Sequence, residues 1–480
     1  MRNTGNDNSR IRSITERLNR FSVEVSLLFS GILLFVLFES LIYLTKLDRS
    51  NPFFILGFFF PFTAFLLITF LIRHIYDINT NSNFFLLIIF IFATIFQIVI
   101  LLTEVTLSDD IYRFFEEGKA ITHGINPYIT PIEDFPSYPK DPYIDQVNNA
   151  NVTSPYPPLA LLLFAFLYLI YPNPIIYRLF FSVGFLISIL FFNRIISHKN
   201  KWKLIIYAWN PLLHLETANG SHFEAIVVLL VLMSLLSLKS KQHEISGFFL
   251  ILGFLLKYYP IFLVFPFWKQ LGRRGLTVIF TGVFLYALFV VLNPFLIHGL
   301  LVYSNEWYFN ASIFWLVYEL LGNFFLSKIL VGIVFTILLS IIAVKTQVDI
   351  TTSYRYAIFV IGSFLLLQPV FHPWYIFWLF PFLIIDNRMN LSWIFLSGTL
   401  ILSYHVYILY DTIGIWVESN LLRMIEYIPF FGLLIFEIWD LRRINQEYST
   451  FKFSIISKKV NFSSLKKIIG VRRNDRHETS

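Results

Sequence analysis

The sequence predicts an all-α protein that crosses a membrane many times. Of its 480 residues, 56% are hydrophobic, 19% aromatic and only 14% charged, a composition far outside that of soluble domains. Apolar runs close to the length of about 20 residues that a helix needs to cross a bilayer recur along the chain. The longest are Val23–Leu44, Phe54–Ile72, Phe84–Thr103, Ile175–Phe192, Leu276–Leu296, Ile329–Val344 and Leu391–Leu409. With the shorter runs between them, we expect a bundle of about 11–14 transmembrane helices.

The chain divides into one membrane domain and two short tails. We assign residues 1–20 to an N-terminal tail, 21–440 to the membrane domain and 441–480 to a basic C-terminal tail. The arginine-bearing segment before the first apolar run has no small-residue cleavage site, so we expect a retained span rather than a signal peptide. The chain has no cysteine, which excludes disulfides, thiolate metal sites and cysteine nucleophiles.

The placement of charge predicts the orientation of the chain. Residues 1–20 hold five arginines against two acids, and residues 441–480 hold ten Lys/Arg against three acids. By the positive-inside rule both termini are expected in the cytoplasm, and the basic tail is expected to touch anionic lipid rather than nucleic acid. Three spans then carry the chain out of the cytoplasm, so the segment 105–173, which is rich in Asp and Glu, becomes an extracytoplasmic loop.

The end of this loop has two interpretations. The run Pro157–Tyr171 is apolar but only 15 residues long. If it were a true span, the basic segment Arg194–Lys203 would lie outside; if it lies at the interface, that segment stays in the cytoplasm. We favour the interfacial helix and expect helical pieces at about 110–122 and 157–170.

Two apolar segments carry interruptions that suggest backbone breaks. One lies at Lys257-Tyr258-Tyr259-Pro260, between basic clusters that the charge rule places on the same side of the membrane. That segment is expected to enter and return as two short helices. The other lies at Pro369–Pro373. Such breaks occur at membrane depth where they line a cavity or are covered by protein.

Several polar residues are candidates for a site. Asp109 and Asp110 are adjacent carboxylates at the edge of a span, where they suit either a general base or a helix cap. Lys257 suits a lipid phosphate as well as it suits a lysine that snorkels to the interface. His214, Glu216, His222 and Glu224 are of types that bind zinc, but with Asn219-Gly220 between them we expect them to contact a sugar rather than a metal. His372 lies between prolines and fits a packed or capping role.

Six motifs, taken in order, resemble a known superfamily. They are SDDIYRFFEEGKAITHGINPY from Ser108, YPPLALLLF from Tyr156, WNPLLHLETANGSHFEA from Trp209, LLKYYPIFLVFP from Leu255, EWYFNASIF from Glu306 and HPWYIFWLFPF from His372. In this order the motifs resemble the GT-C superfamily of integral-membrane glycosyltransferases. They are most similar to bacterial polyprenyl-phosphate-mannose-dependent mannosyltransferases and glycosyltransferase family 87.

This resemblance implies a GT-C-like bundle and a reaction. A hexose, with mannose as the expected sugar, would pass from a polyprenyl-phosphate donor to an extracytoplasmic glycan or lipid-linked acceptor, with inversion. The resemblance implies Asp110 as the general base, because it lies 18 residues before Tyr128, as the acidic residue does in these families, and Asp109 as its catalytic neighbour. Lys257 and Arg113 are the expected ligands of the donor phosphate. The expected substrate contacts are Tyr128, Tyr156, His222, Glu224 and His372.

No metal and no cofactor is expected, because the leaving group is a monophosphate that basic residues can neutralise. The expected partners are the lipid-linked donor, the acceptor and membrane lipids, with no nucleic acid, and the expected location is a bacterial inner membrane. Two other classes stay open. A lipid-linked sugar flippase would more often show an internal repeat, and an O-antigen-type polymerase or ligase would carry catalytic loops rich in Arg and His rather than an early Asp pair.

Overall fold

The computed structural model describes residues 4–76, 83–135, 142–347 and 349–440, with side chains from Val23 onward. The side chains of the N-terminal arginines and the whole basic tail, 441–480, lie outside these described residues.

The α-helices are α1 (Thr4–Thr45), α2 (Pro52–Ile75), α3 (Asn83–Leu101), α4 (Asp110–Thr122), α5 (Pro158–Ile170), α6 (Ile175–Ile195), α7 (Leu204–Ala208), α8 (Pro211–Ala218), α9 (Glu224–Lys239), α10 (His243–Leu256), α11 (Val264–Leu292), α12 (His298–Glu306), α13 (Ile313–Leu321), α14 (Phe324–Lys345), α15 (Ile350–Leu367), α16 (Phe380–Ile385), α17 (Leu391–Thr399) and α18 (His405–Ile413). Residues 420–440 form a further helix. Short 3-10 helices, of which η4 (His198–Lys203), η5 (Tyr259–Leu263), η7 (Pro373–Leu379) and η8 (Leu400–Tyr404) are used below, connect several of them.

The all-α membrane fold is confirmed. Eight helical segments among the described residues are long and apolar enough to cross a membrane, and Pro158–Ile170, His243–Leu256 and Pro373–Ile385 are shorter apolar helices. Each of the seven long apolar runs predicted from the sequence overlaps one of the eight segments, although Phe84–Thr103 and Leu276–Leu296 were predicted to end a few residues too late. The eighth segment, Ile350–Leu367, carries polar residues that obscured it. Eight is below the predicted 11–14, because several apolar stretches form short helices instead of full spans.

Polar caps and prolines set where many of these helices begin. Asn51 accepts a hydrogen bond from the backbone N–H of Phe53 and is followed by Pro52 at the first helical position of α2. Asn210 and Pro211 start α8 in the same way. Proline suits this position because its missing N–H would have no partner in the first turn.

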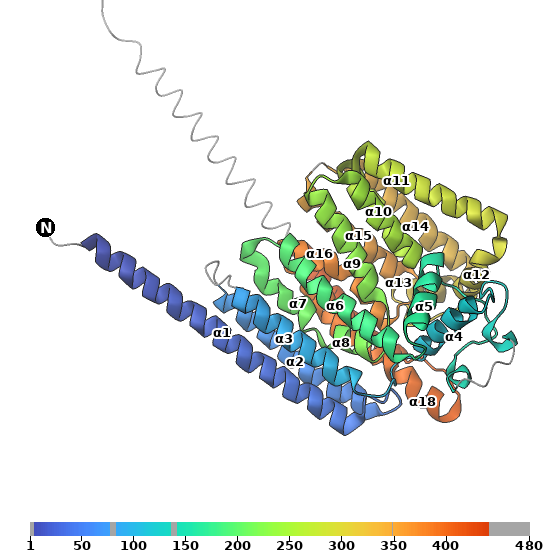
Figure 1. Ribbon diagram of the computed structural model, residues 1–480, viewed down its shortest axis with the longest axis horizontal. Helices are drawn as coiled ribbons and strands as arrows, with labels where there is room; N and C mark the ends of the chain where they lie inside the picture. Colours follow the sequence, from blue (N-terminus) through green and yellow to red (C-terminus); the bar gives the residue numbers. More distant parts are fainter. Residues whose placement is uncertain (1–3, 77–82, 136–141, 348, 441–480) are drawn as a thin grey trace, which may run out of the picture.

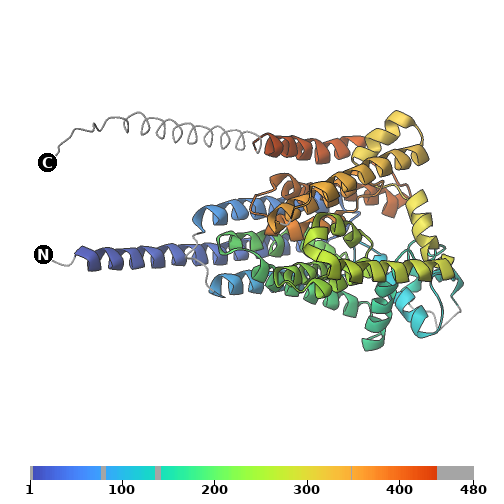
Figure 2. The same ribbon diagram turned by 90° about the horizontal axis from the view of Figure 1, so that it is seen from above.

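The bundle has two ends, which we call the α4 end and the η4 end. Figure 2 shows the long helices running roughly side by side, with α4 and α5 at one end and the start of α1 projecting from the other. The contacts agree with this view. Near the start of α2, Arg49 lies 3.7 Å from Asp109, the residue before α4. At the other end of α2, Tyr76 donates a hydrogen bond to the His198 carbonyl in η4.

The helices α4 and α5 pack closely on each other at the α4 end (Figure 1). Their bounds agree with the helical pieces predicted at about 110–122 and 157–170. A Cβ on Gly118 in α4 would lie 2.5 Å from the Phe164 carbonyl oxygen of α5, so only glycine permits this approach. With 13 residues, α5 is too short to cross the hydrocarbon core, and in Figure 2 it runs across the direction of the long helices.

Both predicted backbone breaks are present. Helix α10 ends at Leu256, Lys257 is extended, and the chain resumes in η5 and α11. The first part of α11 returns to the start of α10, where His243 Nδ1 lies 2.7 Å from the Gln270 carbonyl oxygen. Gly272, with φ of 58°, then turns the chain into the long part of α11. The segment therefore enters and returns as predicted, and the helix after the turn spans the bundle.

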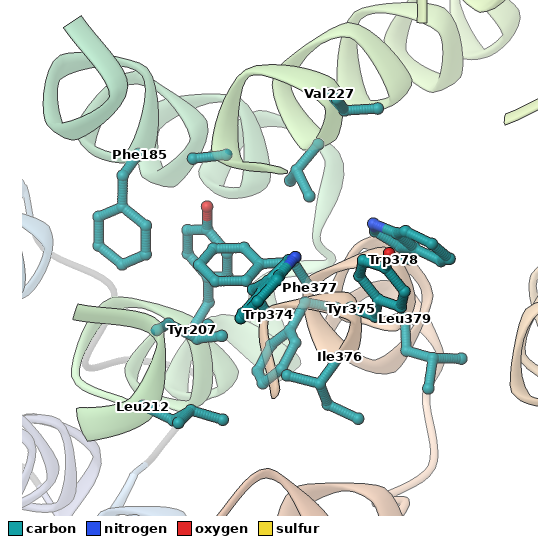
Figure 3. Close-up of a cluster of buried hydrophobic side chains, with 14 of the residues drawn as sticks. Phe185, Tyr207, Leu212, Val227, Trp374, Tyr375, Ile376, Phe377, Trp378 and Leu379 are labelled. Atoms are coloured by element: carbon teal, nitrogen blue, oxygen red, sulfur yellow. The ribbon is translucent and has the colours of Figure 1, made fainter. Parts of the chain in front are cut away.

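The second break joins α15 to η7 through a short extended stretch. There Phe309 and Val370 form a β-bridge, with Phe371 N–H donating to the Phe309 carbonyl at 2.8 Å. The side chains of η7 then extend in different directions (Figure 3): Phe377 lies near Phe185 and Tyr207, and Trp378 lies on the other side.

Candidate active site

The site lies at the α4 end, where loops from distant parts of the chain meet. The segment before the aspartate pair is held in place by Asn219, whose Oδ1 accepts from the Leu107 N–H at 2.9 Å and whose Nδ2 donates to the Glu104 carbonyl at 2.7 Å. Arg178 in α6 donates to the Thr103 carbonyl at 3.0 Å and the Ala218 carbonyl at 2.8 Å. These contacts connect the two motifs that carry Asp110 and His222.

Asp109 faces away from the other candidate residues. Its carboxylate accepts a hydrogen bond from Asn148 Nδ2 at 2.7 Å and lies 3.7 Å from Arg49 Nη2. Arg49 in turn pairs with Asp411 at 2.8 Å and stacks on the Tyr407 ring. Burial raises the pKa of the Asp109 carboxyl, although Arg49 counteracts this effect. Its side chain does not cap α4, because Asn148 and Arg49 occupy it.

Asp110 is the first residue of α4 and points towards His222. Its Oδ2 lies 3.7 Å from His222 Nε2, and about a quarter of its side chain is exposed, 24%. Burial alone would raise the pKa of this carboxyl, but His222, with His372 and Lys257 behind it, holds the pKa at about 2. Asp110 is thus a carboxylate throughout the neutral range and remains open to a substrate.

His222 lies between two carboxylates and on an aromatic ring. Its Nδ1 is 3.0 Å from Glu216 Oε2, and its ring stacks on Trp374 with centroids 3.6 Å apart. Tyr404 donates a hydrogen bond to the other oxygen of Glu216 at 2.8 Å. Burial favours the neutral imidazole, but Asp110 and Glu216 outweigh it and raise the pKa of His222 to about 9.

His372 covers the opposite face of the same indole. Its ring lies 4.2 Å from the Trp374 ring at an angle of 5°, and Phe309 packs beside it at 4.8 Å. Burial lowers the pKa of His372 to about 3, so this imidazole is neutral where His222 is charged. Its side chain caps no helix, so the packed role expected for His372 agrees with the structure and the capping role does not.

Lys257 projects into the site from the break after α10. Its Nζ pairs with Glu224 Oε1 at 2.7 Å and lies over the rings of Phe223 and Tyr375 at 4.8 and 5.3 Å. The lysine side chain is 17% exposed, whereas Glu224 is buried. Its partners are protein groups at the site and not the bilayer interface, which disfavours the snorkelling interpretation.

The two predicted tyrosines lie in the loop that covers α4. Tyr128 donates a hydrogen bond to the Tyr156 carbonyl at 2.8 Å. The Tyr156 ring packs against Phe114 and Phe223, and burial together with the nearby charges of Asp110 and Glu117 raises its pKa. Tyr156 therefore borders the site, while Tyr128 supports it from behind.

Arg113 has other partners. Its guanidinium pairs with Glu117 at 3.2 Å and donates to the carbonyls of Asn148 at 2.8 Å and Val152 at 3.2 Å. Only 5% of the residue is exposed. These contacts fix the loop over α4 and occupy the Arg113 guanidinium.

The structure brings five of the predicted site residues together: Asp110, His222, Glu224, Lys257 and His372. His214 is not among them, because its ring nitrogens contact Gln97 and the Ala208 carbonyl inside the bundle. Sequence reasoning gave no site role to Arg49, Asn148 or Trp374, and it did not connect Glu216 with His222. Only the last pair carried a local signal, since both lie in one motif six positions apart.

Two further observations concern metal-ligating side chains and glycosylation triplets. Within the described residues, no group of three or more His, Cys, Asp or Glu side chains could hold a metal ion. The sequence also contains two triplets that fit the N-glycosylation sequon, Asn151-Val152-Thr153 and Asn310-Ala311-Ser312. Asn151 is exposed, but Asn310 is buried and donates a hydrogen bond to Glu426 at 2.8 Å. Modification at Asn310 would require that contact to break.

Comparison with known proteins gives one similarity, to a family domain. No curated protein and no solved structure matches it. Residues 46–271 match the MptA_B family, described as alpha-(1->6)-mannopyranosyltransferase, N-terminal domain. The match contains Asp109, Asp110, Glu216, His222 and Lys257, and ends before His372. The chain is thus similar over residues 46–271 to a mannosyltransferase domain, which supports a membrane mannosyltransferase-like enzyme of the GT-C type.

Proposed function

We propose that the protein transfers mannose from a polyprenyl-phosphate donor to an extracytoplasmic glycan or lipid-linked acceptor, with inversion and with Asp110 as the general base. The observation that carries this proposal is the convergence of Asp110 and Lys257 on one site at the α4 end. A carboxylate and an ammonium group so placed match the two charges of the reaction, a proton to be removed and a phosphate to be released.

The chemistry is a single displacement. The Asp110 carboxylate accepts the proton of an acceptor hydroxyl while the hydroxyl oxygen attacks the anomeric carbon. The bond between that carbon and the phosphate oxygen breaks, and polyprenyl phosphate departs with the electron pair. Attack from the side opposite the leaving group inverts the anomeric configuration. The ionised state of Asp110 ensures that the base is always available, at the expense of basicity.

Lys257 is the proposed partner of the donor phosphate. In the structure its ammonium pairs with Glu224, whose Oε2 has no hydrogen-bond partner among the described residues. A phosphate oxygen that approaches Lys257 would share it with Glu224, so the lysine would neutralise charge on the leaving group. The partners of Arg113 within the loop make it the weaker of the two expected phosphate ligands.

The sugar is proposed to contact the polar and aromatic groups around this pair. Tyr156, His222, Glu224 and His372 border the site, and ring faces and buried carboxylates are groups that suit sugar hydroxyls and C–H faces. Tyr128 contributes by fixing Tyr156. The charge distribution supports an outer location for the site in a bacterial inner membrane, with both termini in the cytoplasm.

The test is transfer of labelled mannose by the purified protein. With polyprenyl-phosphate mannose and a lipid or glycan acceptor, we expect labelled product of inverted configuration. Asp110→Asn keeps the shape and removes the basicity, so turnover should fall roughly 10²-fold or more. Asp109→Asn is the matched control and should cost less, because Asp109 faces Asn148 and Arg49. Parental turnover of Asp110→Asn would refute the base role.

The same assay separates the competing classes. A flippase would move the lipid-linked sugar across vesicles without forming product, and a polymerase or ligase would transfer a whole glycan from a diphosphate carrier. Transfer from a nucleotide sugar alone would contradict the proposed donor.

A further inference from the structure

We infer that Glu216 is a positioning residue that acts through His222: the carboxylates of Glu216 and Asp110 hold the His222 imidazolium between them, and this clamp fixes the orientation and charge of Asp110. The inference rests on the proposed base role of Asp110. It adds to that role a buried carboxylate that does not itself reach the substrate.

The geometry of the clamp is that of a buried ion triad. His222 Nδ1 lies 3.0 Å from Glu216, and Nε2 lies 3.7 Å from Asp110 on the opposite side of the ring. Glu216 is completely buried and His222 is 2% exposed. Since a buried carboxylate without a cation is costly, Glu216 requires the charged form of His222. The more open Asp110 then gains an oriented positive neighbour.

Local structure shows why the two residues meet. Helix α8 ends at Ala218, Ser221 has a positive φ of 60°, and the chain turns back so that His222 N–H donates to the Glu216 carbonyl at 2.9 Å. A Cβ on Gly220 would lie 2.8 Å from Glu216 Oε2 and 3.0 Å from His222 Nδ1. A side chain at Gly220 would therefore intrude on the contact between the two residues.

Two further contacts hold the clamp from outside. Tyr404, from η8, donates its hydroxyl hydrogen to Glu216 Oε1 and so orients the carboxylate. Trp374 stacks on the imidazole, an arrangement that favours a cation over an aromatic face. These contacts fix the orientation of the imidazole, so that its Nε2 faces Asp110.

The titratable groups around His222 come from several elements. The carboxylates are Asp110 from α4, Glu216 from α8 and Glu224 from α9. The neutral imidazole of His372 lies before η7, and Lys257 at the end of α10 acts on Asp110 and His372. The carboxylates dominate this set, which explains why His222 binds its proton more tightly than a free histidine does. Removing one of the carboxylates must therefore lower the pKa of His222.

The experiment compares wild type, Glu216→Gln and Tyr404→Phe across pH 6 to 10. Glutamine keeps the size of Glu216 and can still accept from Tyr404, but it lacks the charge. In wild type kcat/KM should decline as the pH passes about 9, where His222 loses its proton. In Glu216→Gln we expect this decline to move at least about one pH unit lower. Tyr404→Phe is the matched control: it should lower the rate without changing the pH at which kcat/KM declines. His222→Gln should abolish the decline of kcat/KM near pH 9.

A second measurement needs no substrate. The pKa of His222 is higher in the folded protein, about 9, than in the unfolded chain, about 6.5, so its stabilising effect is complete below pH 6.5 and is lost as the pH rises through 9. The melting temperature in detergent should show that loss, and Glu216→Gln should shift it to lower pH. If neither profile moves, the clamp is refuted. If wild type transfers no mannose, the proposed function fails, and the melting series alone decides the clamp.

Discussion

At the residue scale, the two adjacent aspartates differ because their surroundings differ. Asp109 lies beside an amide and shares Arg49 with Asp411, whereas Asp110 faces an imidazolium. The shifts of their pKa values are therefore opposite, upward for Asp109 and downward for Asp110. Nothing in the dipeptide itself distinguishes them, since the partners come from residues 49, 148 and 222.

The role of Lys257 leads to a prediction about the donor. Lys257→Met should raise the apparent KM for polyprenyl-phosphate mannose at least about tenfold, because the loss of a charge-assisted contact to phosphate costs about 1.5–3 kcal/mol. The KM for the acceptor should stay nearly constant. Lys119→Met is the control: Lys119 lies in α4 and, like Lys257, is paired with a glutamate. This variant should leave the donor KM unchanged. Equal donor KM values in wild type and Lys257→Met would exclude the phosphate contact.

Metal dependence provides a second prediction at this scale. Since Lys257 can neutralise a monophosphate leaving group, transfer should continue at the same rate in excess EDTA. The check is the initial rate with EDTA, and then with added Mg²⁺ or Mn²⁺. Loss of transfer with EDTA and recovery with the metal would assign the aspartate pair to a metal site.

At the element scale, the site depends on how tightly α4 packs on α5. Gly118→Ala would place a methyl group 2.5 Å from the Phe164 carbonyl oxygen, and backbone cannot move aside as a flexible side chain can. We expect the free energy of unfolding to fall by about 1–3 kcal/mol. Thermal unfolding in detergent measures this change.

Gly332→Ala is the matched control, because a Cβ on that helical glycine of α14 meets no atom within 4 Å. Alanine there should be neutral or slightly stabilising, since glycine is the poorer helix former. If Gly118→Ala and Gly332→Ala have the same melting temperature, the close approach of α4 and α5 does not contribute to stability.

Helix boundaries were predictable where the signals were local. The start of α4 after Ser108, the proline start of α5 and the break at Lys257 were all visible as residues next to each other in the sequence. The number of full spans was not predictable to the same degree. The polar residues of Ile350–Leu367 hid a span, and short apolar helices look like spans in composition alone.

At the scale of the whole molecule, the site could not be assembled from the sequence because its contacts join distant segments. Arg49 pairs with Asp411 across 362 positions, and Tyr404 reaches Glu216 across 188. No periodicity or motif links such pairs. The candidate residues that were predicted lie inside compact motifs, whereas Arg49, Asn148 and Tyr404, which contact them or their partners, lie outside those motifs.

The orientation of the molecule has a direct test, because the chain has no cysteine of its own. Asn151→Cys, at the α4 end, and Lys199→Cys, in η4, place single thiols at exposed positions. A membrane-impermeant maleimide should label Cys at 151 in intact cells and Cys at 199 only after permeabilisation. Labelling of both in intact cells would overturn the predicted topology.

The stack of His222, Trp374 and His372 gives the site an optical consequence. An imidazolium in contact with an indole withdraws excited-state electron density, so Trp374 should be dark while His222 is charged and should brighten when His222 becomes neutral. The chain has ten tryptophans, so the emission of Trp374 is obtained as the difference between the emission of wild type and that of Trp374→Phe. The fluorescence of Trp374 should therefore report the protonation state of His222, in detergent or in vesicles, without any attached dye.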